Sequence, residues 1–293
     1  MISSISSYII DVESFIKAAK TKKYLENIKA GRFIIHKGDG NNKIINSLRS
    51  KNIPLNITFN NIQTIQEFSG YISKKIEADS MSLIESFTDE NFLKSLNLTQ
   101  ESVLSLFLPN TYEFFWNTSA DNFREKMVRE FNNFWNENRI DKAKKIGLNP
   151  VEVSVLASIV QKETPKVDER PTIAGVYLNR LSKRMKLQAD PTIVYVIKRK
   201  DGFDKKIRRV LYKDLRIKSP YNTYLNKGLP PGPIVTPDFS AIEAVLNPSS
   251  HNFIFFVADV SNPGYHLFSR TLVEHNRKKR QYTKWLKENR IKR

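Results

Sequence analysis

The strongest structural constraint in this sequence is one clearly bounded apolar helix near the middle of the chain. It is expected to begin at Asn149-Pro150-Val151-Glu152, which places a cap residue before Pro at the first helical position and Glu at the third. Val153–Val160 continues with mostly apolar residues. Pro165 should end the helix near Glu163 or Thr164, because the residue before a proline disfavours helical backbone. The helix therefore carries an apolar stripe that must face a protein core.

Glu163 is expected in the middle of that stripe. At about 100° per residue it falls about 20° from Leu156, whereas Gln161 and Lys162 point elsewhere. Burial of the carboxylate and its place at the negative end of the helix dipole should both raise its pKa. A carboxyl group that keeps its proton near neutral pH suits a general acid. The alternative is a structural ion pair with a downstream arginine, for which the candidates are Arg170, Arg180 and Arg184.

Chain length and composition limit the class of protein. The 293 residues include 40% hydrophobic residues, which is ordinary for a globular protein, and the length suits about two domains. Cys is absent, which excludes disulfides, thiolate metal sites and a Cys nucleophile. No run approaches the about 20 apolar residues of a membrane-spanning helix, so the sequence alone predicts a soluble chain.

The formal net charge is +18, from 48 Lys and Arg against 30 Asp and Glu. Such a charge favours an anionic partner, which could be a nucleic acid, another polyanion or an acidic surface. The basic runs Lys198–Arg209 and Arg277–Arg280 would suit a nucleic-acid-binding protein, but a solvated helix surface explains them as well. The abundance of Lys, Asn and Ile also indicates a compositional bias that raises the charge.

Upstream of the apolar helix, the sequence predicts a helical segment to Lys29, a small α+β module over residues 31–80, and then mainly helices. The expected elements are a strand and turn over Gly31–Gly40, a helix over Asn42–Ser50, a strand over Leu55–Phe59, a helix over Thr64–Lys75, helical pieces over Glu85–Leu106 and a loop over Leu108–Tyr112. Thr118-Ser-Ala-Asp121 is a candidate capping box. The stripe behind it, from Phe123 to Trp135, is expected to be core or docking surface.

Downstream, the pattern predicts shorter elements and a region rich in Pro and Gly, so the fold class is expected to be α+β. The expected elements are a helix over Pro171–Leu181, a helix capped at Asp190-Pro191-Thr192, an irregular Ser219–Pro237, a strand over Phe253–Ala258, a turn over Ser261–Gly264, a return strand over Tyr265–Ser269 and a basic helix from Thr271. Gly228–Pro233 would form a stiff strip that walls a groove, links two parts or binds a proline-recognising partner.

Other catalytic and metal motifs are missing from the sequence. No Ser-His-Asp pattern is present, and the four His do not have metal-ligand spacing, so neither a metal nor a cofactor is expected. Gly38-Asp-Gly40 is too short for a phosphate loop. Short polar and aromatic residues at Asp190–Thr192 and Tyr221–Tyr224 suit sugar hydroxyls and rings, although ordinary caps and turns use the same residues.

Leu156–Thr164 resembles the signature of the endolytic murein transglycosylase family, the YceG-like proteins. Other matching segments follow in the same order, and the resemblance covers about residues 30–285. These segments are Leu108–Tyr112 upstream and, downstream, Glu169-Arg170, Tyr177–Arg180, Leu187–Thr192, Ser219–Tyr224, Gly228–Ile234, Asn247-Pro248, Phe255–Ala258 and His266–Ser269.

The resemblance implies an endolytic lytic transglycosylase, which is a lyase that needs no cofactor. Such enzymes cleave the MurNAc-β-1,4-GlcNAc bond within nascent peptidoglycan strands and leave 1,6-anhydroMurNAc ends, which limits strand elongation. The resemblance implies that Glu163 is the catalytic residue of the family's Lys-Glu-Thr motif; Gln161 stands where some members carry Glu. It also implies that a further set of residues lines the saccharide groove, namely Gln188, Asp190, Tyr221, Asn222, Thr223 and Tyr224.

The resemblance also implies a domain order and a location. We expect an N-terminal helical segment over residues 1–29, a LysM-like α+β module with connecting helices over 30–105, and a mixed α+β catalytic domain over 106–293. Members act at the extracytoplasmic (periplasmic) face of the cytoplasmic membrane on an N-terminal membrane anchor, which is not visible in this sequence. The implied partners are peptidoglycan strands and peptidoglycan synthases, and not nucleic acid.

The sequence departs from the family pattern at two places. Phe253-Ile-Phe-Phe256 stands where members often place Tyr, which would remove one polar contact, and Asp238 stands where Gly is commoner, so the turn there should differ. Two further alternatives stay open. The protein could bind peptidoglycan without cleaving it, or it could be a lysozyme-like hydrolase, although no second carboxylate is apparent from the sequence.

Overall fold

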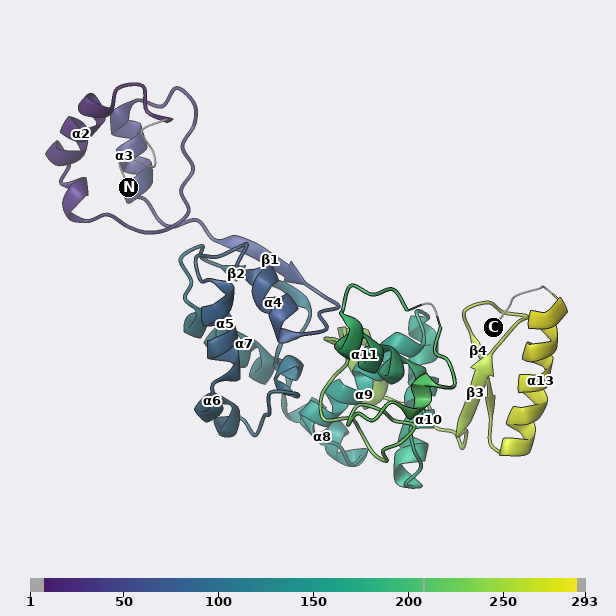
Figure 1. Ribbon diagram of the computed structural model, residues 1–293. Helices are drawn as coiled ribbons and strands as arrows, with labels where there is room; N and C mark the ends of the chain where they lie inside the picture. The colour runs from purple at the N-terminus through teal and green to yellow at the C-terminus, as the bar shows by residue number, and fades with distance from the viewer. Residues whose placement is uncertain (1–7, 208, 289–293) are drawn as a thin grey trace.

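The computed structural model describes residues 8–207 and 209–288. Figure 1 shows three consecutive groups of elements: the N-terminal helices α2 and α3, a group around the strands β1 and β2, and a larger C-terminal group around α9. In the described ranges the strands form two separate antiparallel pairs, and helices make up most of the remaining regular structure. The expected α+β class is therefore confirmed.

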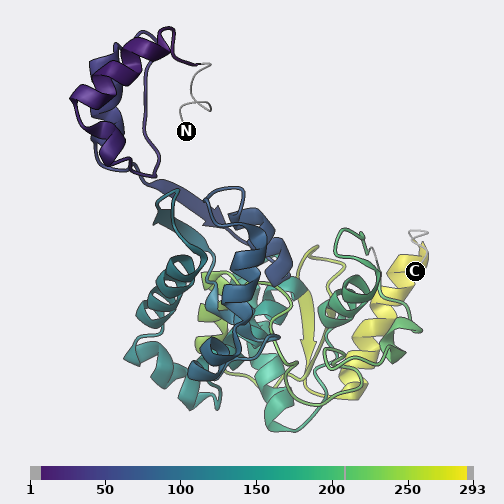
Figure 2. The same ribbon diagram turned by 60° about the vertical axis from the view of Figure 1, so that its left-hand side comes forward.

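The N-terminal group is a small helical unit that lies apart from the rest of the chain in both views (Figures 1 and 2). Its elements are α2 (Val12–Thr21), the 3-10 turn η2 (Tyr24–Glu26) and α3 (Asn41–Arg49). Asp11 caps α2 by accepting a hydrogen bond from the backbone N–H of Ser14 at 2.9 Å. The unit has its own small core, formed by Phe15, Ala19, Tyr24 and Ile45.

The strand expected at the start of Gly31–Gly40 does not form, whereas the turn at its end does. The backbone of Arg32 is occupied locally instead. Its N–H donates to the side chain of Asn52 at 2.8 Å, and its carbonyl accepts from Ile53 at 3.0 Å. An alternating pattern predicts a strand, but it does not show whether a neighbouring strand is available for pairing. The LysM-like character of this region stays a prediction.

The second group is built on the pair β1 (Leu55–Phe59) and β2 (Asn110–Phe114). They are antiparallel, with Leu55 opposite Phe114 and Phe59 opposite Asn110. The expected strand β1 is confirmed. The loop predicted over Leu108–Tyr112 is mostly wrong, because its last three residues belong to β2. A strand whose partner lies far away in the sequence has a weak local signal.

Helices pack an aromatic core behind this pair. Phe68 lies at its centre, with ring centroids 4.5 Å from Phe107 and 5.9 Å from Phe123. Ser119, and not Thr118, caps the helix that carries Phe123, so the expected capping box is wrong by one residue. The elements are α4 (Ile65–Ile72), α5 (Ser80–Thr88), α6 (Glu90–Ser95), η3 (Val103–Leu106) and α7 (Ala120–Phe134).

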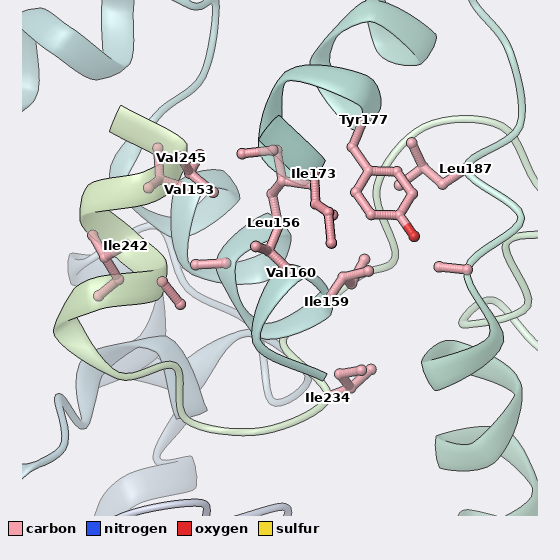
Figure 3. Packing of buried hydrophobic residues seen from close by; sticks show 14 of the residues in the cluster. Val153, Leu156, Ile159, Val160, Ile173, Tyr177, Leu187, Ile234, Ile242 and Val245 are labelled. Carbon is pink, nitrogen blue, oxygen red and sulfur yellow. The ribbon is translucent and has the colours of Figure 1, made fainter. Parts of the chain in front are cut away.

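The third group surrounds the apolar helix predicted from the sequence, which is confirmed as α9 (Pro150–Glu163). Every residue from Val153 to Val160 is buried. Figure 3 shows Leu156 and Ile159 of this helix packed toward Tyr177, with Ile242 on the opposite side. The surrounding helices are α8 (Glu137–Lys145), α10 (Arg170–Ser182), α11 (Asp190–Asp201) and α12 (Phe239–Leu246), with the 3-10 turns η4 (Val167–Glu169) and η5 (Asp214–Arg216).

The C-terminal hairpin is confirmed as β3 (Phe255–Ala258) and β4 (His266–Ser269), and the basic helix as α13 (Leu272–Glu288). Phe255 pairs with Ser269 and Ala258 with His266 in antiparallel register. α13 packs along both strands at the end of the molecule opposite α2 (Figure 1). Within the described residues, no helix has the length and apolar character needed to cross a membrane.

The strip rich in Pro and Gly forms a wall between the second and third groups. A Cβ atom at Gly232 would lie 1.8 Å from the carbonyl oxygen of Glu101, so only glycine fits there. Thr236 and Ile62 exchange two hydrogen bonds, at 2.8 and 3.1 Å. The strip is thus an internal wall. The division of the chain into domains at residue 105 stays a prediction, although the β1–β2 pair crosses it.

Candidate active site

The carboxyl group singled out by the sequence lies at the last residue of α9. The beginning of this helix is held by a reciprocal cap, in which Asn149 accepts from the N–H of Glu152 at 2.9 Å and Glu152 accepts from the N–H of Asn149 at 2.8 Å. Thr164 leaves the helical conformation ahead of Pro165, as expected. The buried stripe then sets the rotation of the helix, which directs the side chain of Glu163 along the same face.

Glu163 is half-buried, and its Oε1 accepts a hydrogen bond from the hydroxyl of Tyr177 on α10. Burial raises the pKa of Glu163 to about 7, and the nearby charge of Asp190 acts in the same direction. The hydrogen bond from Tyr177 and the charge of Arg180 oppose the rise. The protonated and the ionised forms of Glu163 are therefore both well populated near neutral pH. The expected upward shift of its pKa is confirmed.

The structural ion pair that the sequence left open does not form. Arg170 binds Asp238 at 2.8 Å, and Arg180 donates from Nε to the carbonyl of Ile254 at 2.7 Å. Arg184 is exposed. Among the residues described, no Lys, Arg or His lies within 4 Å of the Glu163 carboxylate as an ion-pair partner.

Two cavities meet at Glu163. One, of about 320 Å³, lies between α9, α11 and the chain that follows β1. The other, of about 430 Å³, lies between α10, β3 and α13. Glu163 and Asp190 line both of them. A long substrate that crosses both cavities would therefore pass directly over these two carboxyl groups.

Three of the six residues expected to line a groove are at these cavities. Gln188 and Tyr224 line the larger cavity, and Asp190 lines both. The hydroxyl of Tyr224 donates to Oδ1 of Asp190 at 2.6 Å. Asp190 was expected to cap α11, but it is the first residue of that helix and makes no capping bond. Its carboxylate is free to face the cavities because Ala189 takes the cap position.

The other three expected residues are buried behind the cavities and line neither of them: Tyr221, Asn222 and Thr223. Tyr221 donates its hydroxyl to Glu101 at 2.9 Å. Asn222 donates to the carbonyl of Ile217 at 2.7 Å. Thr223 accepts from the N–H of Ala189 at 3.0 Å. These side chains hold the loops that present the groove residues. The sequence could not separate them from the residues that line the cavities, because a short polar pattern does not show which of its members points inward.

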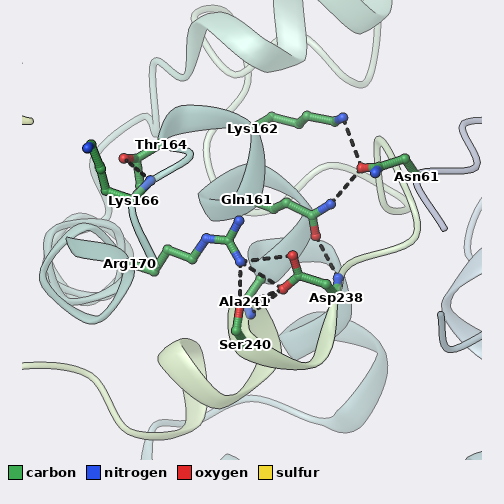
Figure 4. A network of polar contacts seen from close by, with 9 residues as sticks. All are labelled: Asn61, Gln161, Lys162, Thr164, Lys166, Arg170, Asp238, Ser240 and Ala241. Atoms are coloured by element: carbon green, nitrogen blue, oxygen red, sulfur yellow. Dashed lines mark hydrogen bonds and ion pairs between the residues drawn. The ribbon is translucent and has the colours of Figure 1, made fainter. Parts of the chain in front are cut away.

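A polar network around Gln161 fixes the end of α9 (Figure 4). Gln161 accepts from the N–H of Asp238 at 2.6 Å and donates to Asn61 at 2.9 Å. Asp238 also caps α12 and binds the buried Arg170. The turn at Asp238 thus has an ion pair that a glycine there could not make. Gln161 acts through this network and does not contact the cavities.

Sequence reasoning missed several residues that the fold brings to the site. Tyr177 is fully buried and is the hydrogen-bond partner of Glu163. Gln63 reaches the smaller cavity from the second group, and Lys162 and Lys198 reach it from α9 and α11 of the third group. The sequence offered two signals for Tyr177, its place in a segment that resembles the family and its spacing one turn from Arg180, but neither identified Glu163 as the partner of its hydroxyl.

The arrangement can exchange a proton with a substrate bound across the two cavities. Within residues 8–207 and 209–288, no three His, Asp or Glu side chains are grouped closely enough to hold a metal ion. A carboxyl group with a pKa of about 7 can give its proton to a leaving oxygen and take one back at the same pH. The arrangement therefore suits general acid–base chemistry on an extended substrate.

The chain belongs to the YceG-like family, whose model matches residues 5–281. It is 32% identical over 305 residues to the endolytic murein transglycosylase of Bacillus subtilis, a match covering 96% of this chain and 82% of the relative. It is 27% identical to the endolytic murein transglycosylase of Streptococcus pneumoniae, where 88% of this chain spans about half (51%) of the relative. A crystal structure of a YceG-like protein from Listeria monocytogenes superposes with a TM-score of 0.65 at 28% identity over 94% of each chain.

Proposed function

We propose that this protein is an endolytic peptidoglycan lytic transglycosylase. It cleaves the MurNAc-β-1,4-GlcNAc bond within glycan strands and leaves 1,6-anhydroMurNAc ends. The observation that carries the proposal is the carboxyl group of Glu163, which has a pKa of about 7 and lies at the meeting point of two cavities. The relatives named endolytic murein transglycosylase support the same activity.

The reaction needs one proton to be given and one to be taken. Glu163 donates its proton to the glycosidic oxygen, and the bond from that oxygen to C1 of MurNAc breaks. The C6 hydroxyl of the same MurNAc then attacks C1, and the Glu163 carboxylate takes the hydroxyl proton. The carboxyl group returns to its starting form and no water is consumed. An internal nucleophile benefits from proximity, so one carboxyl group can serve both steps.

The flanking residues suit this chemistry. Tyr177 holds Oε1 of Glu163, which leaves the second oxygen available for the glycosidic oxygen. Gln188, Asp190 and Tyr224 supply polar groups for sugar hydroxyls and the acetamide on the larger-cavity side. Phe255 and Phe256 of β3 form an apolar wall in the same cavity, where a sugar face can pack.

A second candidate is hydrolysis, because Asp190 provides a second carboxyl group at both cavities. In a hydrolase, this group would activate a water molecule or attack C1 while Glu163 acts as the acid. The hydrogen bond from Tyr224 already occupies one oxygen of Asp190. The products separate the two reactions: hydrolysis gives reducing MurNAc ends, whereas the lyase gives anhydro ends that are lighter by one water.

The test is the incubation of uncrosslinked peptidoglycan strands with the wild type, Glu163→Gln and the exposed control Glu125→Gln. Product ends are identified by mass spectrometry. We expect anhydro ends from the wild type and the control, and a loss of about 100-fold or more in Glu163→Gln, the usual size of general acid–base catalysis. Anhydro ends at wild-type rate from Glu163→Gln would overturn the assignment.

We further propose that the protein acts at the extracytoplasmic face of the cytoplasmic membrane, where nascent strands are made, and beside peptidoglycan synthases. The net charge of +18 suits an anionic wall and membrane surface. Residues 30–105 would act as the LysM-like module with its connecting helices. Fractionation of cells and crosslinking to synthases test the two parts of this proposal separately.

A further inference from the structure

The smaller of the two cavities at Glu163 has a cationic wall. Among the residues that the structure describes, three basic side chains line it: Lys162 of α9, Lys198 of α11 and Arg209 of the loop after α11. We call this space of about 320 Å³ the cationic cavity. The larger cavity also contains basic side chains, Arg180 and Lys279, and is distinguished by the strand β3, which forms one of its walls. The strand β3 therefore borders a substrate on only one side of the carboxyl group.

Neutral partners hold the two lysines in place. The ammonium of Lys162 lies 3.3 Å from Oδ1 of Asn61, and that of Lys198 lies 3.1 Å from Oε1 of Gln63. Among the described residues, no carboxylate lies within 4 Å of either ammonium. The segment after β1 thus orients both positive charges without neutralising them, and their charge remains available to a ligand.

The carboxyl groups of the cavity wall do not balance these cations. In the described part of the chain, only Glu163 and Asp190 contribute such groups to the wall. Glu163 carries its proton about half of the time near neutral pH, and Asp190 is bonded to Tyr224 on the side of the larger cavity. Reduced hydration and the neighbouring Lys198 both lower the pKa of Lys162. A bound anion would relieve this repulsion between the two lysines.

We propose that the cationic cavity is a subsite for a carboxylate of the peptide that the glycan strand carries on MurNAc. This inference rests on the proposed function. The sugar rings of such a strand are neutral, and its negative charges lie on the substituent of MurNAc. A strand that crosses the site with its rings against β3 can place that substituent on the opposite side of Glu163. Lys162 and Lys198 then receive the carboxylate as a pair of charge-assisted donors.

The subsite also gives the second group of the fold a direct part in substrate selection. Asn61 and Gln63 follow β1, and Ile62 between them is buried in the aromatic core. The exchange of hydrogen bonds between Ile62 and Thr236 fixes this segment against the third group. The positions of the two ammonium groups therefore depend on the docking of the two groups, and not on α9 and α11 alone.

The test compares two preparations of the same uncrosslinked strands, one with free peptide carboxylates and one in which a carbodiimide and ammonia have converted them to amides. Hydrofluoric acid first removes phosphate-linked polymers from both. The readout is the ratio of kcat/KM for anhydro-end formation on the two preparations. We expect a ratio of about ten for the wild type, the effect of one charge-assisted bond at a partly exposed site. The ratio should fall to about two in Lys198→Gln and below one in Lys198→Glu.

Lys200→Gln is the matched control, because Lys200 lies on the exposed outer side of the same helix and does not line the cavity. General attraction to a basic protein would lower the ratio equally in Lys198→Gln and Lys200→Gln, and that result would overturn the subsite. A wild-type ratio of one would overturn it as well. Strands not treated with hydrofluoric acid are assayed in parallel. If Lys198→Gln lowers kcat/KM only on these strands, and not on treated ones, the ligand is polymer phosphate and not a peptide carboxylate.

Equilibrium binding tests the same preference without turnover. The affinities for the two preparations are compared in Glu163→Gln and in the double variant that also carries Lys198→Gln. If the wild type forms no anhydro ends but the binding preference depends on Lys198, the proposed reaction fails while the subsite stands. If turnover occurs and neither ratio depends on Lys198, the subsite fails alone.

Discussion

The hydrogen bond from Tyr177 to Glu163 should determine the pH at which the enzyme works. Tyr177 is fully buried on α10, and its hydroxyl stabilises the carboxylate form of Glu163. Tyr177→Phe removes this bond and leaves the burial that raises the pKa of Glu163. A hydrogen bond to a charged group contributes ~1.5–3 kcal/mol, part of which water from the cavities can replace at this half-buried carboxyl. A net loss of ~1.4 kcal/mol would move the pKa of Glu163 from about 7 to about 8.

The assay is the pH dependence of kcat/KM for anhydro-end formation, which reports groups of the free enzyme. The first step needs protonated Glu163, so kcat/KM should be level at acidic pH and fall about tenfold per pH unit above the pKa. We expect the fall to begin near pH 7 in the wild type and about one pH unit higher in Tyr177→Phe. The variant should therefore lose less activity than the wild type between pH 7 and pH 8.

Tyr112→Phe is the control, since Tyr112 is also buried and its hydroxyl donates to a backbone carbonyl, that of Leu108, at 2.7 Å, away from the site. It should alter stability and leave the pH profile in place. A Tyr177→Phe enzyme with lower activity but an unchanged pH profile would refute the reasoning, because it would show that Tyr177 only supports the fold.

Three further predictions concern stability, measured by urea unfolding. Glu163→Gln should be more stable than the wild type by about 1–2 kcal/mol at pH 8, and no more stable at pH 4. The pKa of Glu163 in the folded protein, about 7, exceeds the usual 4.5, so the wild type loses stability as the pH rises between these two values. The loss is smaller than the full linkage value because the carboxyl group faces open cavities. Equal gains at both pH values would contradict this cause. Asn149→Ala removes the cap of α9 and should cost about 1 kcal/mol, whereas Asn226→Ala in a surface loop, which also loses side-chain bonds, serves as the comparison. Asp238→Asn leaves the buried Arg170 without its ion pair and should lower the free energy of unfolding by about 1–2 kcal/mol at pH 7, a modest cost because Asp238 is partly exposed. The stability difference from the wild type should shrink as the pH falls through the lowered pKa of Asp238. A difference that stays constant with pH would count against the ion pair.

Local sequence signals were sufficient wherever an element is specified by its own residues. The cap at Asn149, the apolar run that follows and Pro165 gave both ends of α9 correctly. The same periodicity placed Glu163 on the buried face. The C-terminal hairpin was also predicted, because an apolar strand, a turn with Pro and Gly and a return strand are adjacent in the sequence.

Local signals failed where a partner lies far away in the sequence. The segment at Gly31 alternates like a strand but has no neighbour to pair with, whereas Asn110–Phe114 looked like a loop and pairs with a strand more than 50 residues earlier. Tyr221–Thr223 and Tyr224 looked alike in sequence, yet only Tyr224 reaches a cavity. The direction of a loop side chain depends on the elements that pack beneath it.

The sequence by itself therefore determined α9, the place of Glu163 at its end and the family. These depend on capping, helical periodicity and motif order, which are properties of neighbouring residues. Only the tertiary structure decided that Tyr177 would bond Glu163 across 14 residues, and that Gln63 would orient Lys198 across 135 residues. Such contacts form when the helices and the segment after β1 dock, because hydrogen bonds and charges act over a few ångströms in space regardless of separation along the chain.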